Sequence, residues 1–234
     1  MKSLSKNELD DSGYGSAWKY FISADNAINA MHIYSLLVKD CIEKKQSRFI
    51  GIISGNIELP ENECSMIPGD TVSLFGEKIQ LSFLANMYIN AFFQECRNFF
   101  DYVAQIIVEI FSNEKPHVGS VDFFKISQMT FANISVKEFI DEIKNSNKYK
   151  YICDFNNTTK HNYNIGIISK ITTKDLTLGC NIPPFKKEFK NKQHNSYVAV
   201  DIENKMDEIF KFTNKAFTQM VDFVHNHISL ISSN

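Results

Sequence analysis

Apolar side chains recur at alternating steps of four and three residues between residues 78 and 111, and this series constrains the fold more than any other feature. Its members are Ala85, Ile89, Phe92, Cys96, Phe99, Val103, Ile106 and Ile110. Because an α-helix turns once in about 3.6 residues, these steps line one side of a helix roughly 50 Å long. Such a stripe is typical of long helices that pack lengthwise on one another. Phe93, Phe100 and Ile107 widen it, which predicts contact with more than one neighbouring helix.

Other segments have the same helical spacing. Apolar residues of segment 202–231 predict a second long helix, and those of segment 24–45 predict a third, with Ser23 or Asp25 as its N-cap. A shorter helix is predicted to start at Ser135. Two local patterns support that start, the capping-box spacing of Ser135 with Glu138 and the hydrophobic-staple positions of Ile134 and Phe139. The Asn-Ser-Asn run after it can cap a further helix over about 148–159.

Between the helices the spacing becomes that of short strands. Segments 49–53 and 57–59 flank a Ser-Gly-Asn turn and predict a hairpin. Further strands are expected at 71–75, 165–171, 176–178 and 197–200. We therefore predict a mainly α protein, an up-down bundle of four to five helices. It forms a single domain over residues 1–234, with small β-hairpin insertions at about 49–75 and 165–200.

Composition narrows the class of protein. The formal net charge of −2 does not indicate a strongly basic nucleic-acid binder, although a local basic patch is compatible with it. No apolar run has the length needed to cross a bilayer, and the polar start of the chain is not typical of a signal peptide. Five cysteines without a Cys-x-x-Cys pair favour a reducing setting, so we expect a cytoplasmic protein without membrane contact.

The stretch 154–161, Asp-Phe-Asn-Asn-Thr-Thr-Lys-His, is the part of the chain that most suggests chemistry. It resembles the motif of the HEPN superfamily of helical bundles, an Arg followed after four to six residues by His, with a polar residue often next to the Arg. Asn157 matches the polar position and His161 the histidine. The closest likeness is to a bacterial branch with the signature Asn-x-x-Lys-His. The aromatic helix around Arg97 also looks like a helix of this family, so the resemblance covers about two-thirds of the chain.

The resemblance implies a homodimer in a bacterial RNA- or nucleotide-linked stress or defence pathway, such as a toxin–antitoxin system. Many family members are metal-independent endoribonucleases, and others have lost catalysis. If this chain cleaves RNA, His161 would manage the proton, while Lys160, Asn157 and Asn156 would hold the phosphate, with Arg97 as a further cation. The departure is at the candidate Arg positions counted back from His161, which hold Asn156, Phe155 and Asp154, and none of these is basic. The alternative is a non-catalytic module that binds a protein partner or a nucleotide.

Each candidate also has a structural interpretation. His161 can be a C-capping histidine, worth ~0.3–1 kcal/mol through the helix dipole. Arg97, Asp101 and Asn90 form a polar edge on the aromatic helix, which can face a groove or a dimer partner, or can simply be a surface ion pair with solvated neighbours.

The basic stretch 185–194 is a second candidate for binding. Lys187 and Lys190, with the two nearby phenylalanines, can bind phosphate and stack a base, or can belong to the solvated arm of a hairpin. We find no metal-ligand spacing, phosphate loop or other cofactor motif, so we predict no metal and no cofactor. A small-molecule enzyme with a pocket invisible in the sequence is a third alternative.

Overall fold

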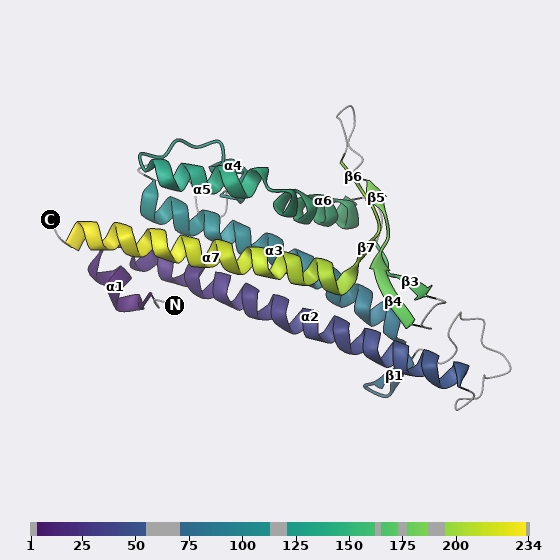
Figure 1. Cartoon of the computed structure of the whole chain (residues 1–234). Coiled ribbons are helices and arrows are strands. Elements are labelled where there is room, and N and C mark those ends of the chain that lie inside the picture. Colours follow the sequence, from purple (N-terminus) through teal and green to yellow (C-terminus); the bar gives the residue numbers. More distant parts are fainter. Residues whose placement is uncertain are drawn as a thin grey trace. The chain divides into compact units, whose positions relative to one another are not determined.

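The computed structural model describes residues 4–54, 71–112, 121–161, 165–172, 177–186 and 195–232. This part of the chain is mainly helical, as predicted, with short antiparallel strands (Figure 1). Its seven α-helices are α1 (Lys6–Asp11), α2 (Trp18–Ile53), α3 (Leu81–Phe111), α4 (Phe123–Ile126), α5 (Ile134–Asn145), α6 (Asn147–His161) and α7 (Ile202–Ser232). A 3₁₀ turn, Gly15–Ala17, joins α1 to α2. Helix predictions at 78–111, 202–231 and 148–159 are confirmed with small shifts at their ends.

The described strands form three small antiparallel sheets. The first is the hairpin of β1 (Thr71–Leu74) and β2 (Glu77–Gln80). The second has the order β3 (Ile168–Thr172), β4 (Thr177–Ile182), β7 (Val200–Asp201). The third pairs β5 (Phe185–Lys186) with β6 (Ser196–Tyr197). The predicted strands at 71–75, 165–171 and 176–178 are thus confirmed with shifted ends, whereas the one predicted at 197–200 is divided between β6 and β7.

The hairpin predicted from residue 49 is wrong in its first strand. Residues 49–53 are the last turns of α2, and the Ser54 amide still donates to the Ile50 carbonyl at 2.9 Å. A short apolar run cannot by itself distinguish a strand from a helix. Here the run follows a helix that has already formed, and extending a helix adds one hydrogen bond per residue without a new nucleation cost. The proposed second strand, 57–59, lies outside the described residues.

Two predicted helix starts are also wrong. Helix α2 begins at Trp18, so Ser23 and Asp25 lie inside it, and the Ser23 hydroxyl donates to the Lys19 carbonyl instead of capping. Helix α5 begins one residue earlier than predicted. Its cap is Asn133, whose side chain accepts from the Val136 amide at 3.3 Å, and Ile134 is 73% exposed and therefore staples nothing. Asparagine is as good an N-cap as serine, so the competing cap one residue upstream of Ile134 prevailed.

Backbone contacts divide the chain into two compact units. Unit 1 comprises Met1–Met31, Gln94–Cys153 and Ile209–Asn234, and unit 2 comprises His32–Phe93 and Asp154–Glu208. The helices α2, α3, α6 and α7 each contribute residues to both units. One domain over residues 1–234 therefore stays a prediction.

The core of unit 1 is aromatic and sulfur-rich. The ring of Phe100, which is fully buried, lies 5.5 Å from that of Phe123, 5.1 Å from that of Tyr149 and 5.7 Å from that of Phe212. Nearby, the buried Cys96 thiol lies 3.1 Å from the Met31 sulfur. Phe100 and Cys96 both belong to the widened apolar stripe of α3, and both are buried.

In unit 2 the β1–β2 hairpin packs on α2 and on the start of α3. Val72, Leu74 and Ile79 pack on a buried cluster formed by Cys41, Leu81, Leu84 and Ala85.

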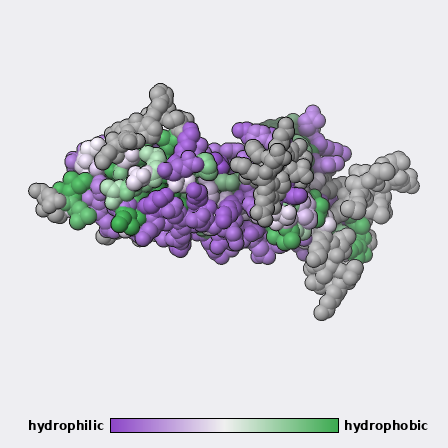
Figure 2. Space-filling model, turned by 90° about the horizontal axis from the view of Figure 1, so that it is seen from above, coloured by the Kyte–Doolittle hydropathy of each residue, from purple (hydrophilic) through white to green (hydrophobic). Residues whose placement is uncertain are grey.

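On the face seen in Figure 2, hydrophilic side chains occupy most of the described surface and hydrophobic areas are separate from one another. Among the described residues, no helix combines the length and apolar character that crossing a membrane requires.

Candidate functional site at the end of helix α6

The orientation of the end of α6 is set by Phe155. This side chain is fully buried, and its ring stacks on that of Phe93 in α3 with centroids 4.1 Å apart. The ring of Phe185 meets it edge-on at 5.8 Å. A buried aromatic ring of this size contributes a large share of local packing energy, so α6 cannot rotate without losing it. All of these residues belong to unit 2.

Asn156, one of the candidate positions for the Arg of the resembled motif, bonds to the backbone of α3. Its Nδ2 donates to the carbonyl of Phe93 at 2.7 Å. The side chain is half-buried, and the bond ties α6 to α3 beside the Phe93–Phe155 stack. A Cβ placed on Gly166 would lie 3.7 Å from the Asn86 amide nitrogen, so residue 166 lies beside the start of α3.

Asp154 anchors strand β6 to the same helix. Its carboxylate is buried, with the residue 3% exposed, and Oδ2 accepts from Asn195 Nδ2 at 2.7 Å and from the Tyr197 hydroxyl at 2.8 Å. The Tyr197 ring also stacks on Phe185 of β5, with centroids 4.7 Å apart. Both strands of the β5–β6 pair are therefore attached to α6.

Lys187 and Lys190, the basic candidates of the sequence, lie outside the described residues. They belong to the segment of the chain that connects β5 to β6.

Three polar side chains of the motif share the outer side of α6. Asn157, Lys160 and His161 stand at positions i, i+3 and i+4, which lie on one side of a helix. Lys160 and His161 are exposed, and Asn157 is half-buried. His161 is the last residue of the helix, where a protonated imidazole interacts favourably with the helix dipole. Phe155 and Thr158 of the same helix are buried, so the outer side is distinct from the packing side.

Buried polar atoms accompany the packing side of α6 in unit 2. Thr158 Oγ1 and Asn86 Oδ1 are both buried and make no hydrogen bond within the described structure. The Asn90 side-chain oxygen is buried as well. The side-chain oxygen of Asn90, one residue of the polar edge that the sequence places on α3, is therefore buried, although the residue as a whole is half-buried. Sequence reasoning found the edge but could not tell that this oxygen is buried.

Arg97 and Asp101 belong to unit 1, where they form the predicted ion pair. Arg97 Nε lies 3.6 Å from Asp101 Oδ2, and its Nη1 donates to the Cys153 sulfur at 3.0 Å. Asp101 Oδ1 also accepts from the Phe123 amide at 3.1 Å. Burial raises the pKa of Asp101, and the Arg97 charge and the Phe123 amide act against that rise. Cys153 was not among the expected site residues. Its spacing of 56 residues from Arg97 gives no sequence signal.

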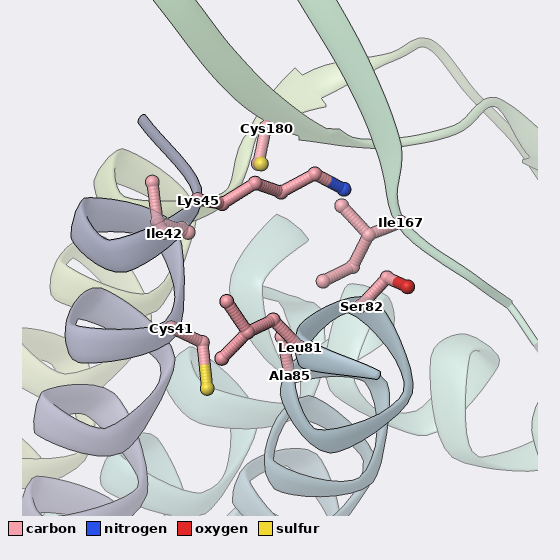
Figure 3. Close-up of a pocket in the computed structure, with 8 residues that line it drawn as sticks. All are labelled: Cys41, Ile42, Lys45, Leu81, Ser82, Ala85, Ile167 and Cys180. Atoms are coloured by element: carbon pink, nitrogen blue, oxygen red, sulfur yellow. The ribbon is translucent and has the colours of Figure 1, made fainter. Parts of the chain in front are cut away.

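A small hollow in unit 2 is lined by residues of α2, α3 and the β3–β4 region (Figure 3). Its lining consists of Cys41, Ile42, Lys45, Leu81, Ser82, Ala85, Ile167 and Cys180. Its cavity volume of ≈ 10 Å³ corresponds to about one water molecule, so it does not fit a substrate. Within the described part of the chain, no group of His, Cys, Asp and Glu side chains has the arrangement of a metal site.

A comparison with models of known protein families gives no match for this chain, and neither do comparisons with curated proteins and with solved structures. The described residues and the motif resemblance are therefore what bear on its function.

Proposed function

We propose that the chain is a HEPN-like protein that binds RNA or a nucleotide through the outer side of the end of α6, as a homodimer in a bacterial stress or defence pathway. One observation carries this proposal. Asn157, Lys160 and His161 share an exposed side of the helix, while Asp154, Phe155 and Asn156 hold that helix in place. The exposed residues are thus available for a ligand, and the anchoring residues position them.

The chemistry of the three side chains fits a phosphate. Lys160 brings a positive charge and the Asn157 amide a hydrogen-bond donor. The His161 imidazole brings a nitrogen that can act as a general base, which is what removal of the 2′-hydroxyl proton requires in metal-free RNA cleavage. In that reaction the 2′-oxygen attacks phosphorus, the 5′-oxygen leaves, and the positive charge of Lys160 stabilises the crowded phosphate.

The anchoring of the β5–β6 pair supports the same site. Since Asp154 holds β6 on α6, both ends of the connecting segment 187–194 start from strands attached to this helix. That segment carries Lys187 and Lys190. Lysine side chains are what a nucleic-acid backbone binds, and the role expected of Lys187 and Lys190 stays a prediction.

Fluorescence anisotropy with a labelled single-stranded RNA tests binding. We expect the double variant Lys160→Ala/His161→Ala to weaken binding about threefold to tenfold at low salt. It should also reduce the slope of log K against log salt by ~0.7 for each phosphate that the variant no longer neutralises. The matched control is Lys78→Ala, which removes one exposed positive charge from β2 of the same unit. Unchanged binding by the double variant, or equal weakening in the control, would contradict the proposal.

Catalysis is tested separately, with EDTA present. If the site cleaves RNA, His161→Ala abolishes cleavage while retaining most of the binding supplied by Lys160. Equal cleavage by His161→Ala and the natural protein would remove His161 from the mechanism.

The second candidate is a non-catalytic module that binds a protein or a nucleotide. It is favoured by Asn156, whose neutral amide occupies one of the candidate positions for the motif Arg and is bonded to the Phe93 carbonyl. Purification from the native host distinguishes the two. Recovery of one protein partner without nucleic acid supports the module, and co-purified RNA supports the first candidate.

A further inference from the structure

A thiol in unit 1 lies between a guanidinium and a phenol. Cys153, in α6, is half-buried and accepts a hydrogen bond from Arg97 Nη1 at 3.0 Å. Positive charge at this distance favours the thiolate over the thiol, and the thiolate is the reactive form of cysteine. The other described cysteines, Cys41, Cys96 and Cys180, are all buried, so Cys153 differs from each of them in exposure.

The second observation concerns Tyr149, one turn before Cys153 on α6. The residue is 6% exposed, and its hydroxyl is buried without a hydrogen bond of normal geometry. Burial chiefly raises the pKa of this hydroxyl. Tyr149 and Cys153 stand four residues apart on α6, so they lie on the same side of the helix. A buried phenol there can donate to a negative sulfur, or to an oxygen atom added to it.

Asp101 partly offsets the positive charge that Arg97 places beside the thiol. Its carboxylate lies 3.6 Å from Arg97 Nε and also accepts from the Phe123 amide. Burial opposes the charge on Arg97, but the acidic groups around it, with Cys153 first and Tyr149, Asp101 and Asp122 after it, together raise its pKa. Arg97 therefore stays charged and is shared between a carboxylate and a sulfur.

From this arrangement we infer that Cys153 is a peroxide-sensitive modification site, in which Arg97 stabilises the thiolate and Tyr149 hydrogen-bonds the oxidised product. The thiol first loses its proton to solvent. The thiolate sulfur then attacks one oxygen of hydrogen peroxide, an S–O bond forms and the O–O bond breaks. Hydroxide leaves and takes a proton from solvent, so sulfur is oxidised to a sulfenic acid and the departing oxygen is reduced to water.

The experiment uses the full chain with Cys64→Ser in every protein, because Cys64 lies outside the described residues. Protein is treated with hydrogen peroxide, trapped with dimedone and mapped by mass spectrometry. We expect dimedone on Cys153 and none on Cys41, Cys96 or Cys180 until the protein is unfolded in urea. Absence of label on Cys153 in the folded protein, or equal label on the buried cysteines, would overturn the inference.

The role of Arg97 is tested by the pH profile of alkylation with iodoacetamide, a readout that a purely structural role would not move. We expect a midpoint for Cys153 below the ordinary thiol value of about 8.5. Arg97→Met should move the midpoint upward and slow peroxide oxidation at pH 7 about threefold. The expected effect is modest because the thiolate that Arg97 favours in the natural protein is more abundant but also less nucleophilic. Arg97→Lys should restore part of both effects.

Asp101→Asn provides a variant with the opposite expected direction. The amide oxygen can still accept from the Phe123 amide, so the fold of that turn is preserved, while the negative charge near Arg97 is removed. We expect a lower alkylation midpoint than in the natural protein. A midpoint at or above about 8.5 in the natural protein, unmoved by both Arg97→Met and Asp101→Asn, would show that the guanidinium does not activate the thiol.

Discussion

At the scale of single residues, Asp154 shows how one buried carboxylate can hold two elements together. Its Oδ2 accepts one hydrogen bond from Asn195 and one from Tyr197. Hydrogen bonds to a charged group contribute about 1.5–3 kcal/mol, so we expect Asp154→Ala to lower the free energy of unfolding by about 2 kcal/mol. Tyr197→Phe, which keeps the stack on Phe185 and removes one donor, should cost about half as much. Urea unfolding measures both, and natural stability in Asp154→Ala would contradict the anchoring role.

His227 makes stability depend on pH. Its Nε2 lies 3.1 Å from the Tyr14 hydroxyl and its ring 4.9 Å from that of Phe111, and burial lowers the pKa of the imidazole. Between the folded pKa and the unfolded value of about 6.5, the unfolded chain binds more protons, so stability rises with pH in that window. The contribution is present above about pH 6.5 and is lost as pH falls through the folded pKa.

Because the ring is only partly buried, we expect stability to fall by less than about 1 kcal/mol on acidification. Urea unfolding between pH 7 and pH 5 checks it. His227→Gln should flatten this part of the profile, whereas His32→Gln, at an exposed histidine, should leave it as it is. Identical pH profiles for the natural protein and His227→Gln would show that His227 is not the source of the pH dependence.

At the scale of elements, the start of α5 separates a cap that forms from one that does not. Asn133 accepts from the Val136 amide, whereas Ser135 is an exposed residue of the first turn. Asn133→Ala should therefore lower the free energy of unfolding by about 1 kcal/mol. Ser135→Ala should change it by less than about 0.5 kcal/mol, as exposed substitutions usually do. Chemical unfolding measures the free energy of unfolding of both variants. A larger loss in Ser135→Ala than in Asn133→Ala would show that Ser135 is the N-cap after all.

The β1–β2 hairpin contains an avoidable strain. Phe75 has φ 54° and is wholly exposed, and Gly76 follows with φ 85°, in a two-residue loop between the paired Leu74 and Glu77. Such loops favour asparagine before glycine, because asparagine tolerates positive φ better than a bulky aromatic residue. We expect Phe75→Asn to raise thermal stability by roughly 0.5–1 kcal/mol, since no buried area is removed. Gly76→Ala should lower it, and a decrease in stability in Phe75→Asn would show that the phenylalanine has another role.

At the scale of the whole molecule, neither unit is a continuous stretch of chain. Each of α2, α3, α6 and α7 passes residues to both units, so melting such a helix affects both. We therefore expect one cooperative unfolding transition, with equal calorimetric and van't Hoff enthalpies.

Two buried phenylalanines, one in each unit, check this expectation. Phe99→Ala in unit 1 and Phe155→Ala in unit 2 each remove a fully buried ring and should cost about 3–5 kcal/mol. Both variants should lower the same transition in calorimetry. Two transitions, of which each variant moves only one, would instead indicate two domains.

The sequence alone determined the long helices. Heptad spacing predicts α3 and α7, because helix geometry depends only on neighbours in the chain. The sequence ended the helix before Lys160, so it was the extension of α6 to His161 that placed Asn157, Lys160 and His161 on one side of it. It failed at the end of α2 and the start of α5, where two local signals competed.

Only the tertiary structure decided what holds the site and where the thiol lies. Asn156 meets Phe93 across 63 residues, Asp154 meets Tyr197 across 43, and Arg97 meets Cys153 across 56. These partners come together because packing brings distant segments side by side, and no spacing along the chain encodes which buried polar group will meet which. The sequence could thus offer the motif residues as candidates, while folding assigned Asn156 and Asp154 to anchoring and placed a guanidinium against a cysteine.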